Sequence, residues 1–240
     1  MPVLLELDQV SAGYGKVEIL HDLSIAVPQG SVVALLGSNG AGKTTTLRSV
    51  SGTLPVRAGS IRLDGVRIDG RSAFEVARAG VVLVPEGRGV FPTLSVSDNL
   101  RVAAHAGRTT SGQARQARVE SVLETFPRLR ERLSQRAGSL SGEEQQMLAL
   151  SRALLADPKV LLMDEISMGL APMVVQQLFE TVAELKNRGL TIVLVEQYLT
   201  YALRMADLCY VLAKGRVAFV GEPAELSGGR ALADAYLGLG

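Results

Sequence analysis

Four short runs of almost uninterrupted apolar residues recur along the chain, at residues 32–36, 81–84, 160–163 and 191–195. A strand whose side chains are covered on both faces has this pattern, whereas a strand with one wet face alternates apolar and polar residues. The runs therefore predict a parallel β-sheet that lies between layers of helices, which is an α/β fold with a doubly covered core.

The segment between the last two runs has helical periodicity instead. Apolar residues recur at three- and four-residue steps from Val174 to Leu185, which predicts an amphipathic helix over residues 173–187. Gly189 follows at a position suited to ending such a helix.

The two remaining regions differ from this core. Residues 4–10, 17–27 and 60–63 show strand patterns separated by turn residues, which predicts an antiparallel β part. Residues 95–138 carry no strand signal and have a helical composition. We therefore expect one domain over residues 1–240, in which residues of about 1–94 and 139–240 form the core and about 95–138 form a helical insert.

The predicted insert is basic, since residues 108–136 hold seven Arg and three Glu. A solvated helical face and a charged docking surface both fit this composition. Aromatic residues are nearly absent from it, which argues against single-stranded nucleic acid as a ligand.

The composition of the whole chain excludes several classes of protein. Twenty-five basic and 24 acidic residues give a net charge of +1, so bulk charge does not draw the chain to nucleic acid or anionic membranes. The apolar fraction is 47%, yet no apolar run approaches the roughly 18–20 residues of a membrane-spanning helix. The single cysteine, Cys209, excludes an internal disulfide framework, and residues 1–6 lack the features of a signal peptide.

A glycine-rich segment follows the first apolar run. Residues 37–44 match the P-loop pattern and lie between a predicted strand and a predicted helix, which is the context that such a loop requires. Lys43 would bridge the β- and γ-phosphates of a nucleotide, and the Thr44 hydroxyl would bind Mg²⁺. The backbone of this turn and the helix start would surround the phosphates. The predicted nucleotide site includes Gly37, Ser38, Asn39, Gly40, Ala41, Gly42, Lys43, Thr44 and Thr45.

Two carboxylates, Asp164 and Glu165, follow the third apolar run. The carboxyl ends of parallel strands hold the ligand in folds of this kind. Asp164 is suited to Mg²⁺, and Glu165 is suited to act as the general base that polarises the attacking water. By itself such a pair often marks only a strand that meets solvent, but the P-loop upstream favours the catalytic interpretation.

Leu140-Ser141-Gly142-Glu143-Glu144 precedes a further helical pattern. A capping box with Ser141 as the N-cap accounts for this segment by itself. In a P-loop protein with a helical insert, however, its place about twenty residues before the Asp164 strand resembles the ATP-binding subunits of ABC transporters. The resemblance covers residues 3 to about 222. It implies that Ser141 and Gly142 of one subunit close over the ATP held by a partner's P-loop, so that hydrolysis requires a head-to-tail dimer.

The resemblance assigns three further residues. Tyr14 matches the aromatic residue that stacks on adenine. Glu86 occupies the Q-loop position, which senses the γ-phosphate and the membrane partner. Gln197 stands where many members carry a switch histidine, and residues 167–170 take the place of the D-loop. The catalytic residues implied are Glu165, Lys43, Gln197 and Glu86, and the Mg²⁺ ligands implied are Thr44, Glu86 and Asp164.

The variants at these positions resemble one subfamily, the second ATPase subunit of bacterial branched-chain amino acid importers, with relatives in urea and amide uptake. This implies that the chain uses ATP and Mg²⁺ to power uptake of branched-chain or other hydrophobic amino acids. Its partners would be a second ABC ATPase subunit, identical or different, two transmembrane permease subunits and, indirectly, a solute-binding protein, with no nucleic acid. It would lie peripherally on the cytoplasmic face of the inner or cell membrane.

Four positions depart from the family pattern, namely Ser38, Glu143, Ile166 and Met168. Glu143 matters most, because it places a carboxylate where a glycine N–H group normally approaches the partner's γ-phosphate. One such charge pair at about 4 Å costs on the order of 4 kcal/mol at an effective dielectric near 20. The composite site that uses this segment is therefore predicted to be slowed. An importer ATPase for urea or amides and a catalytically weakened, nucleotide-gated ABC subunit remain as alternatives. An ABC ATPase acting on DNA or ribosomes would usually carry a long coiled coil or a second ATPase domain.

Overall fold

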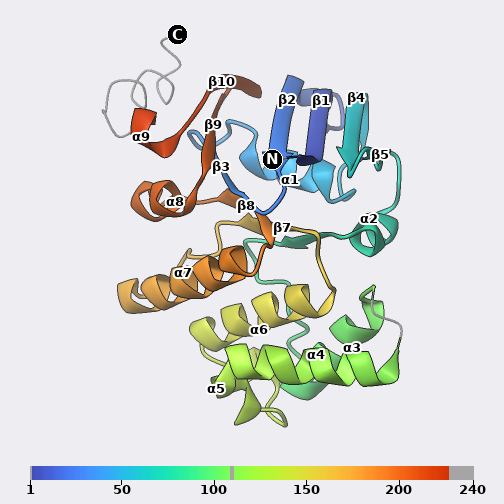
Figure 1. Cartoon of the computed structure of the whole chain (residues 1–240), viewed down its shortest axis with the longest axis vertical. Coiled ribbons are helices and arrows are strands. Elements are labelled where there is room, and N and C mark those ends of the chain that lie inside the picture. Colours follow the sequence, from blue (N-terminus) through green and yellow to red (C-terminus); the bar gives the residue numbers. More distant parts are fainter. Residues whose placement is uncertain (1, 109–110, 227–240) are drawn as a thin grey trace.

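A six-stranded sheet forms the centre of the computed structural model, which describes residues 2–108 and 111–226 (Figure 1). Neighbouring strands are parallel except for β10, which is antiparallel to β9. Every residue of β3, β7 and β8 is buried, which confirms the predicted doubly covered sheet. The spatial order is β10 (Arg216–Gly221), β9 (Leu208–Ala213), β3 (Val32–Leu36), β8 (Thr191–Val195), β7 (Val160–Asp164) and β6 (Val81–Val84).

A second, antiparallel sheet lies at the amino-terminal side of the molecule (Figure 1). It confirms the predicted antiparallel part, although its strands are longer than the sequence pattern indicates. Register shifts between β1 and β2 allow this, because they absorb the residues that break strict alternation. Its order is β2 (Val17–Pro28), β1 (Val3–Tyr14), β4 (Val56–Leu63) and β5 (Val66–Arg67).

Helix α1 (Lys43–Val50) packs between the two sheets. Successive side chains of β3 point to opposite faces of the central sheet and enter two different apolar clusters. Val33 and Leu35 lie in the same apolar cluster as Leu47 of α1. Ala34 and Leu36 belong to the opposite cluster, which the helices of the other face complete. The strand therefore contributes to two cores at once, as side chains that alternate across a strand must.

The opposite cluster is built from a layer of helices below the sheet in Figure 1. The described part of residues 95–138 contains helices and one isolated β-bridge between Ser95 and Arg136. Helix α6, which lies outside the predicted insert, packs against both α3 and α4, so the helical layer continues into the core. This layer includes α3 (Val96–Ala106), α4 (Gly112–Thr125), α5 (Pro127–Arg130), a 3₁₀ turn (Ala137–Ser139) and α6 (Gly142–Leu155).

The remaining helices are shorter, apart from α7 (Pro172–Asn187), which confirms the predicted amphipathic helix. Pro172 takes its first position, and Gly189 has a φ of 85° just beyond its end. The others are α2 (Ala73–Ala79), α8 (Leu199–Met205) and α9 (Pro223–Leu226). Within the described ranges, no helix combines the length and hydropathy needed to cross a bilayer. The predicted core at residues 227–240 lies outside the described residues.

Candidate nucleotide-binding site

The glycine-rich turn lies at the carboxyl end of β3 and leads directly into α1. Gly37 has a φ of 143°, and a Cβ there would lie 2.4 Å from the carbonyl oxygen of Leu212, so the backbone passes too close for any other residue. Gly42 has a φ of 108° and is the N-cap of α1, whose start no side chain of the described residues caps. Its backbone N–H groups and positive dipole end are therefore available to an anion.

Lys43 crosses this turn with a largely buried side chain. Its Nζ donates hydrogen bonds to the carbonyl oxygens of Gly37, at 2.9 Å, and Ser38, at 3.1 Å. Burial lowers the pKa of Lys43, while the carboxylates of Glu165 and Asp164 oppose that shift. The geometry places a cation in the centre of the turn, where phosphate oxygens could replace the two carbonyl acceptors.

Thr44 and Asp164 meet beside this cation. The Thr44 hydroxyl donates to Oδ1 of Asp164 at 3.2 Å. Burial raises the pKa of Asp164 to about 6, and the charges of Glu165 and Glu86 add to the rise against the hydrogen bond from Thr44. A divalent cation would favour the ionised carboxylate.

The protein oxygens present fit Mg²⁺ as it binds in nucleotide sites. The described residues contain no group of three or more His, Cys, Asp and Glu side chains able to hold a metal by themselves. Mg²⁺ instead commonly takes one or two protein oxygens and completes its shell with phosphate oxygens and water. Thr44 and Asp164 supply such a pair.

An open cleft of about 370 Å³ lies in front of the turn. At its far wall, Nε2 of Gln197 donates to Oε2 of Glu165 at 2.8 Å. Tyr14 is 43% exposed at the rim, and its hydroxyl accepts a hydrogen bond from Arg48 at 3.1 Å. Predicted site residues that line the cleft are Tyr14, Asn39, Gly40, Gly42, Lys43, Thr44, Thr45, Glu86, Glu165 and Gln197.

Ser141 and Gly142 do not line this cleft. They lie at the start of α6, where the Ser141 hydroxyl accepts from the N–H of Glu144 at 3.2 Å and Glu144 accepts from the N–H of Ser141 at 2.9 Å. The structure thus contains the capping box that the sequence indicates. Arg88, from the segment after β6, packs against Gly142 and donates to Gln145 at 2.7 Å.

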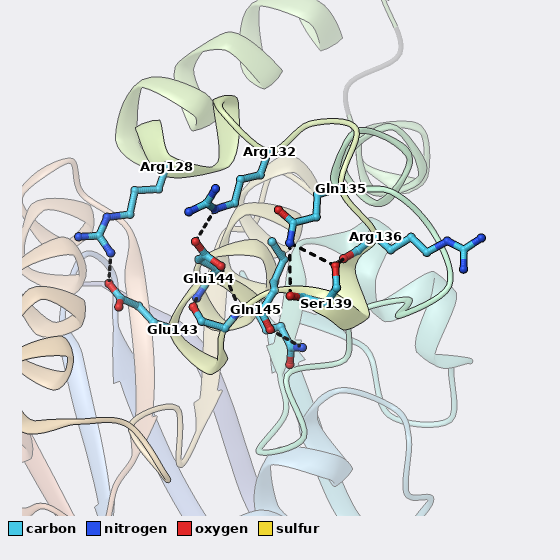
Figure 2. Close-up of polar contacts among 10 residues, drawn as sticks. Arg128, Arg132, Gln135, Arg136, Ser139, Glu143, Glu144 and Gln145 are labelled. Atoms are coloured by element: carbon cyan, nitrogen blue, oxygen red, sulfur yellow. Dashed lines mark hydrogen bonds and ion pairs between the residues drawn. The ribbon is translucent and has the colours of Figure 1, made fainter.

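Figure 2 shows that the two acidic side chains after Gly142 point toward arginines of the insert. Arg128 pairs with Glu143 at 3.1 Å, and Arg132 pairs with Glu144. Just before α6, Gln135 donates to the backbone and hydroxyl oxygens of Ser139. The Glu143 carboxylate therefore has a cationic partner within its own chain, which lowers the electrostatic cost expected from its sequence position.

Other arginines of the basic insert are also paired. Arg118 contacts Asp157 at 2.9 Å, and Arg130 contacts Glu120 at 2.8 Å. Much of the insert's positive charge is therefore matched by carboxylates that lie elsewhere in the chain or on the insert itself. This favours the interpretation of a solvated, internally paired surface over a uniformly basic docking surface.

One buried acid beside the cleft was missed by the sequence analysis. Glu196 is only 2% exposed, and both its oxygens accept hydrogen bonds from Ser167. Burial raises the pKa of Glu196 to about 7 against the hydrogen bonds from Ser167, which act to lower it. The available signal was an acidic residue directly after the fully apolar strand 191–195.

The chain is similar to a known protein family and to transport ATP-binding proteins of two organisms. The family model described as "ABC transporter" matches residues 20–167. The chain is 46% identical over 235 residues to the high-affinity branched-chain amino acid transport ATP-binding protein BraG of Pseudomonas aeruginosa, covering 98% of this chain and 100% of that protein. It is 36% identical to the probable branched-chain amino acid transport ATP-binding protein LivF of Archaeoglobus fulgidus, covering 93% and 94% of the two chains.

Solved structures give the same picture of the fold. The ATP-binding subunit of an ABC transporter, 31% identical, superposes with a TM-score of 0.85 over 98% of this chain and 99% of that one. A nucleotide-free ATP-binding cassette from an ABC transporter has a TM-score of 0.86 over 98% and 99% of the chains at 23% identity, which supports the fold alone.

Proposed function

Since the chain belongs to the ABC transporter family, we propose that it is the ATP-hydrolysing subunit of an importer for branched-chain or other hydrophobic amino acids. The observation that carries the hydrolytic part is the cleft. It brings Lys43, the Thr44–Asp164 pair and the Gln197–Glu165 pair to one edge of the sheet. The names of the two relatives carry the choice of solute.

The residues have separable tasks in the proposed reaction. The turn of residues 37–44 and Lys43 hold the β- and γ-phosphates, and the exposed ring of Tyr14 offers a stacking surface to adenine. Thr44 and Asp164, with Glu86 at the cleft wall, hold Mg²⁺, which supplies charge neutralisation at the phosphates. Glu165 accepts the proton of the attacking water at Oε1 or Oε2, and Gln197 orients that carboxylate through its amide.

The second half of each site comes from another subunit in this proposal. Ser141 and Gly142 lie outside the cleft of their own chain, at a helix start whose N–H groups suit a phosphate. A head-to-tail pair of ATPase subunits would place this helix start over the partner's nucleotide. We infer that two permease subunits and, through them, a solute-binding protein complete the importer at the cytoplasmic face of the membrane.

The test is Glu165→Gln in the full chain, with Glu180→Gln on the exposed face of α7 as the matched control. Loss of the general base should reduce ATP hydrolysis by at least about 100-fold while ATP still binds. Glu180→Gln should hydrolyse ATP like the wild type. Unchanged hydrolysis in Glu165→Gln would contradict the proposed mechanism.

Uptake in cells tests the solute. A deletion strain that carries the wild-type gene should take up radiolabelled leucine, and the same strain with Glu165→Gln should not. Uptake that is restored for urea but not for leucine would replace the amino acid with a small amide as the solute.

A further inference from the structure

Glu196 has an unusual environment for an acidic residue. It is 2% exposed, directly follows β8, and does not line the cleft. Oε1 accepts from the backbone N–H of Ser167 at 3.2 Å, and Oε2 accepts from the Ser167 hydroxyl. Ser167 is itself 1% exposed, so a buried residue donates to both oxygens of a buried carboxyl group.

This pair joins two segments that carry the proposed catalytic residues. Residues 165–168 follow β7, and residues 196–197 follow the neighbouring strand β8. The N–H of Glu165 donates to the carbonyl oxygen of Val195 at 2.8 Å, and Gln197 donates to the Glu165 carboxylate at 2.8 Å. Glu196 adds a third link, because both oxygens of this buried acid accept hydrogen bonds from Ser167 of the first segment.

The turn needs such support, because Glu165 has a φ of 48°. A non-glycine residue in this left-handed region costs on the order of 1 kcal/mol or more and persists only where its surroundings hold it. A buried carboxyl group is a poor source of stability by itself, because its desolvation offsets its hydrogen bonds. The pair therefore explains the geometry of the turn better than it explains the stability of the fold.

We propose that Glu196 is a positioning residue for ATP hydrolysis, which holds Ser167 and thereby fixes the Glu165 carboxylate at the wall of the cleft. This inference rests on the proposed function for its kinetic consequence. Its structural part, the restraint of residues 165–168, does not depend on hydrolysis and has its own test, which is hydrogen exchange.

The kinetic experiment compares Glu196→Leu, Glu196→Gln and Ser167→Ala in the full chain. Displacement of a catalytic group by about 1 Å can cost about 100-fold in rate. Glu196→Leu should therefore lower kcat by about 100-fold, with the affinity for a fluorescent ATP analogue within about threefold of the wild type. Glu196→Gln keeps one acceptor for Ser167 and should therefore retain most of the wild-type kcat. Ser167→Ala should lower kcat by a smaller factor in the Glu196→Gln background than in the wild-type background.

Thr191→Val is the matched control. Thr191 is 1% exposed at the opposite end of the same strand, where its Oγ1 accepts from the N–H of Gly30 at 2.8 Å. Its loss removes a comparable buried hydrogen bond and should lower Tm without changing kcat. If Glu196→Leu behaves like Thr191→Val, with a lower Tm and a wild-type kcat, the inference is wrong.

Two outcomes need a second measurement. If Glu196→Leu does not fold, wild-type kcat values in both Glu196→Gln and Ser167→Ala would overturn the inference. If the wild-type chain hydrolyses no ATP even when assembled with its partner ATPase and permease subunits, the proposed function fails, and hydrogen exchange decides the structural part. Faster amide exchange at Ser167 and Met168 in Glu196→Gln would support the restraint, and unchanged exchange would refute it.

Discussion

The cleft and the start of α6 differ in how their charged side chains are compensated. In the cleft, Lys43 and Asp164 are buried with shifted pKa values and are satisfied by neutral groups of the turn. At the start of α6, Glu143 and Glu144 each have an arginine partner (Figure 2). Buried groups with shifted pKa values are typical of ligand-binding sites, as in the first region. In the second region, the ion pairs instead stabilise the start of a helix. Substitutions should therefore affect ligand binding in the first region, and local stability and, to a smaller extent, the rate of hydrolysis in the second.

The largest effect is expected for Lys43→Ala. It removes the cation at the centre of the turn, so ATP affinity and hydrolysis should each fall by at least about 100-fold. Thermal stability should fall little, because burial of the lysine is already unfavourable. Titration with a fluorescent ATP analogue and a thermal melt check both parts. Wild-type affinity would show that the cleft does not hold the phosphates.

The second prediction concerns pH and Glu196. The pKa of this carboxyl rises from 4.5 to about 7 in the folded protein, so the folded state retains a proton that the unfolded state releases. The resulting stabilisation is full below pH 4.5 and is lost as pH rises through 7. Between pH 4.5 and 8, the free energy of unfolding of the wild type should therefore fall by up to about 3 kcal/mol relative to that of Glu196→Gln.

Urea denaturation of both proteins at several pH values measures this difference. Asp164 also titrates with a raised pKa, but it is present in both proteins and cancels in the comparison. Parallel stability profiles for the wild type and Glu196→Gln would contradict the prediction.

The third prediction contrasts two arginines of the helical layer. Arg132→Ala leaves the mostly buried Glu144 carboxylate without its cation and should lower the free energy of unfolding by about 1–2 kcal/mol. Arg130 pairs with an exposed Glu120, so Arg130→Ala should cost no more than about 0.5 kcal/mol. Urea denaturation of both variants tests whether the Arg132–Glu144 pair stabilises the fold more than an exposed ion pair does because Glu144 is buried.

The smallest effect is expected at Glu143. If Arg128 neutralises this carboxylate, Arg128→Ala should slow hydrolysis by about three- to tenfold in the wild-type background and not at all in Glu143→Gly. By the same reasoning, Glu143→Gly alone should accelerate hydrolysis only slightly, less than its sequence position suggests. A large acceleration would show that the ion pair does not shield the composite site. Steady-state rates of ATP hydrolysis by the wild type, the two single variants and the double variant measure this coupling.

The apolar runs predicted the central strands well, because a doubly covered strand leaves no polar position to blur the pattern. Strand β9 was not predicted although it is also an apolar run, and β10 was not predicted because it lies at the edge of the sheet and leaves alternate residues exposed. The P-loop, Asp164 and Glu165 could be proposed because each chemical group lies within a contiguous motif.

The contacts that the sequence analysis missed join residues that are far apart in the sequence. Arg128 and Glu143 are 15 residues apart, and Ser167 and Glu196 are 29 apart. The position of Glu196 directly after the apolar strand 191–195 was a local signal, but the burial of its carboxyl group depends on how β8 lies beside β7. The orientation of Glu143 likewise depends on where α5 packs.

Cys209 gives these experiments a practical route. It is the single cysteine of the chain, and it is fully buried in β9. Burial raises the pKa of its thiol to about 11, so little reactive thiolate forms near neutral pH. A cysteine introduced on an exposed surface, for example in place of Met173, would then be the preferred target for a maleimide label. Spin or fluorescent labels could therefore report the distance between two copies in solution without first removing a native thiol.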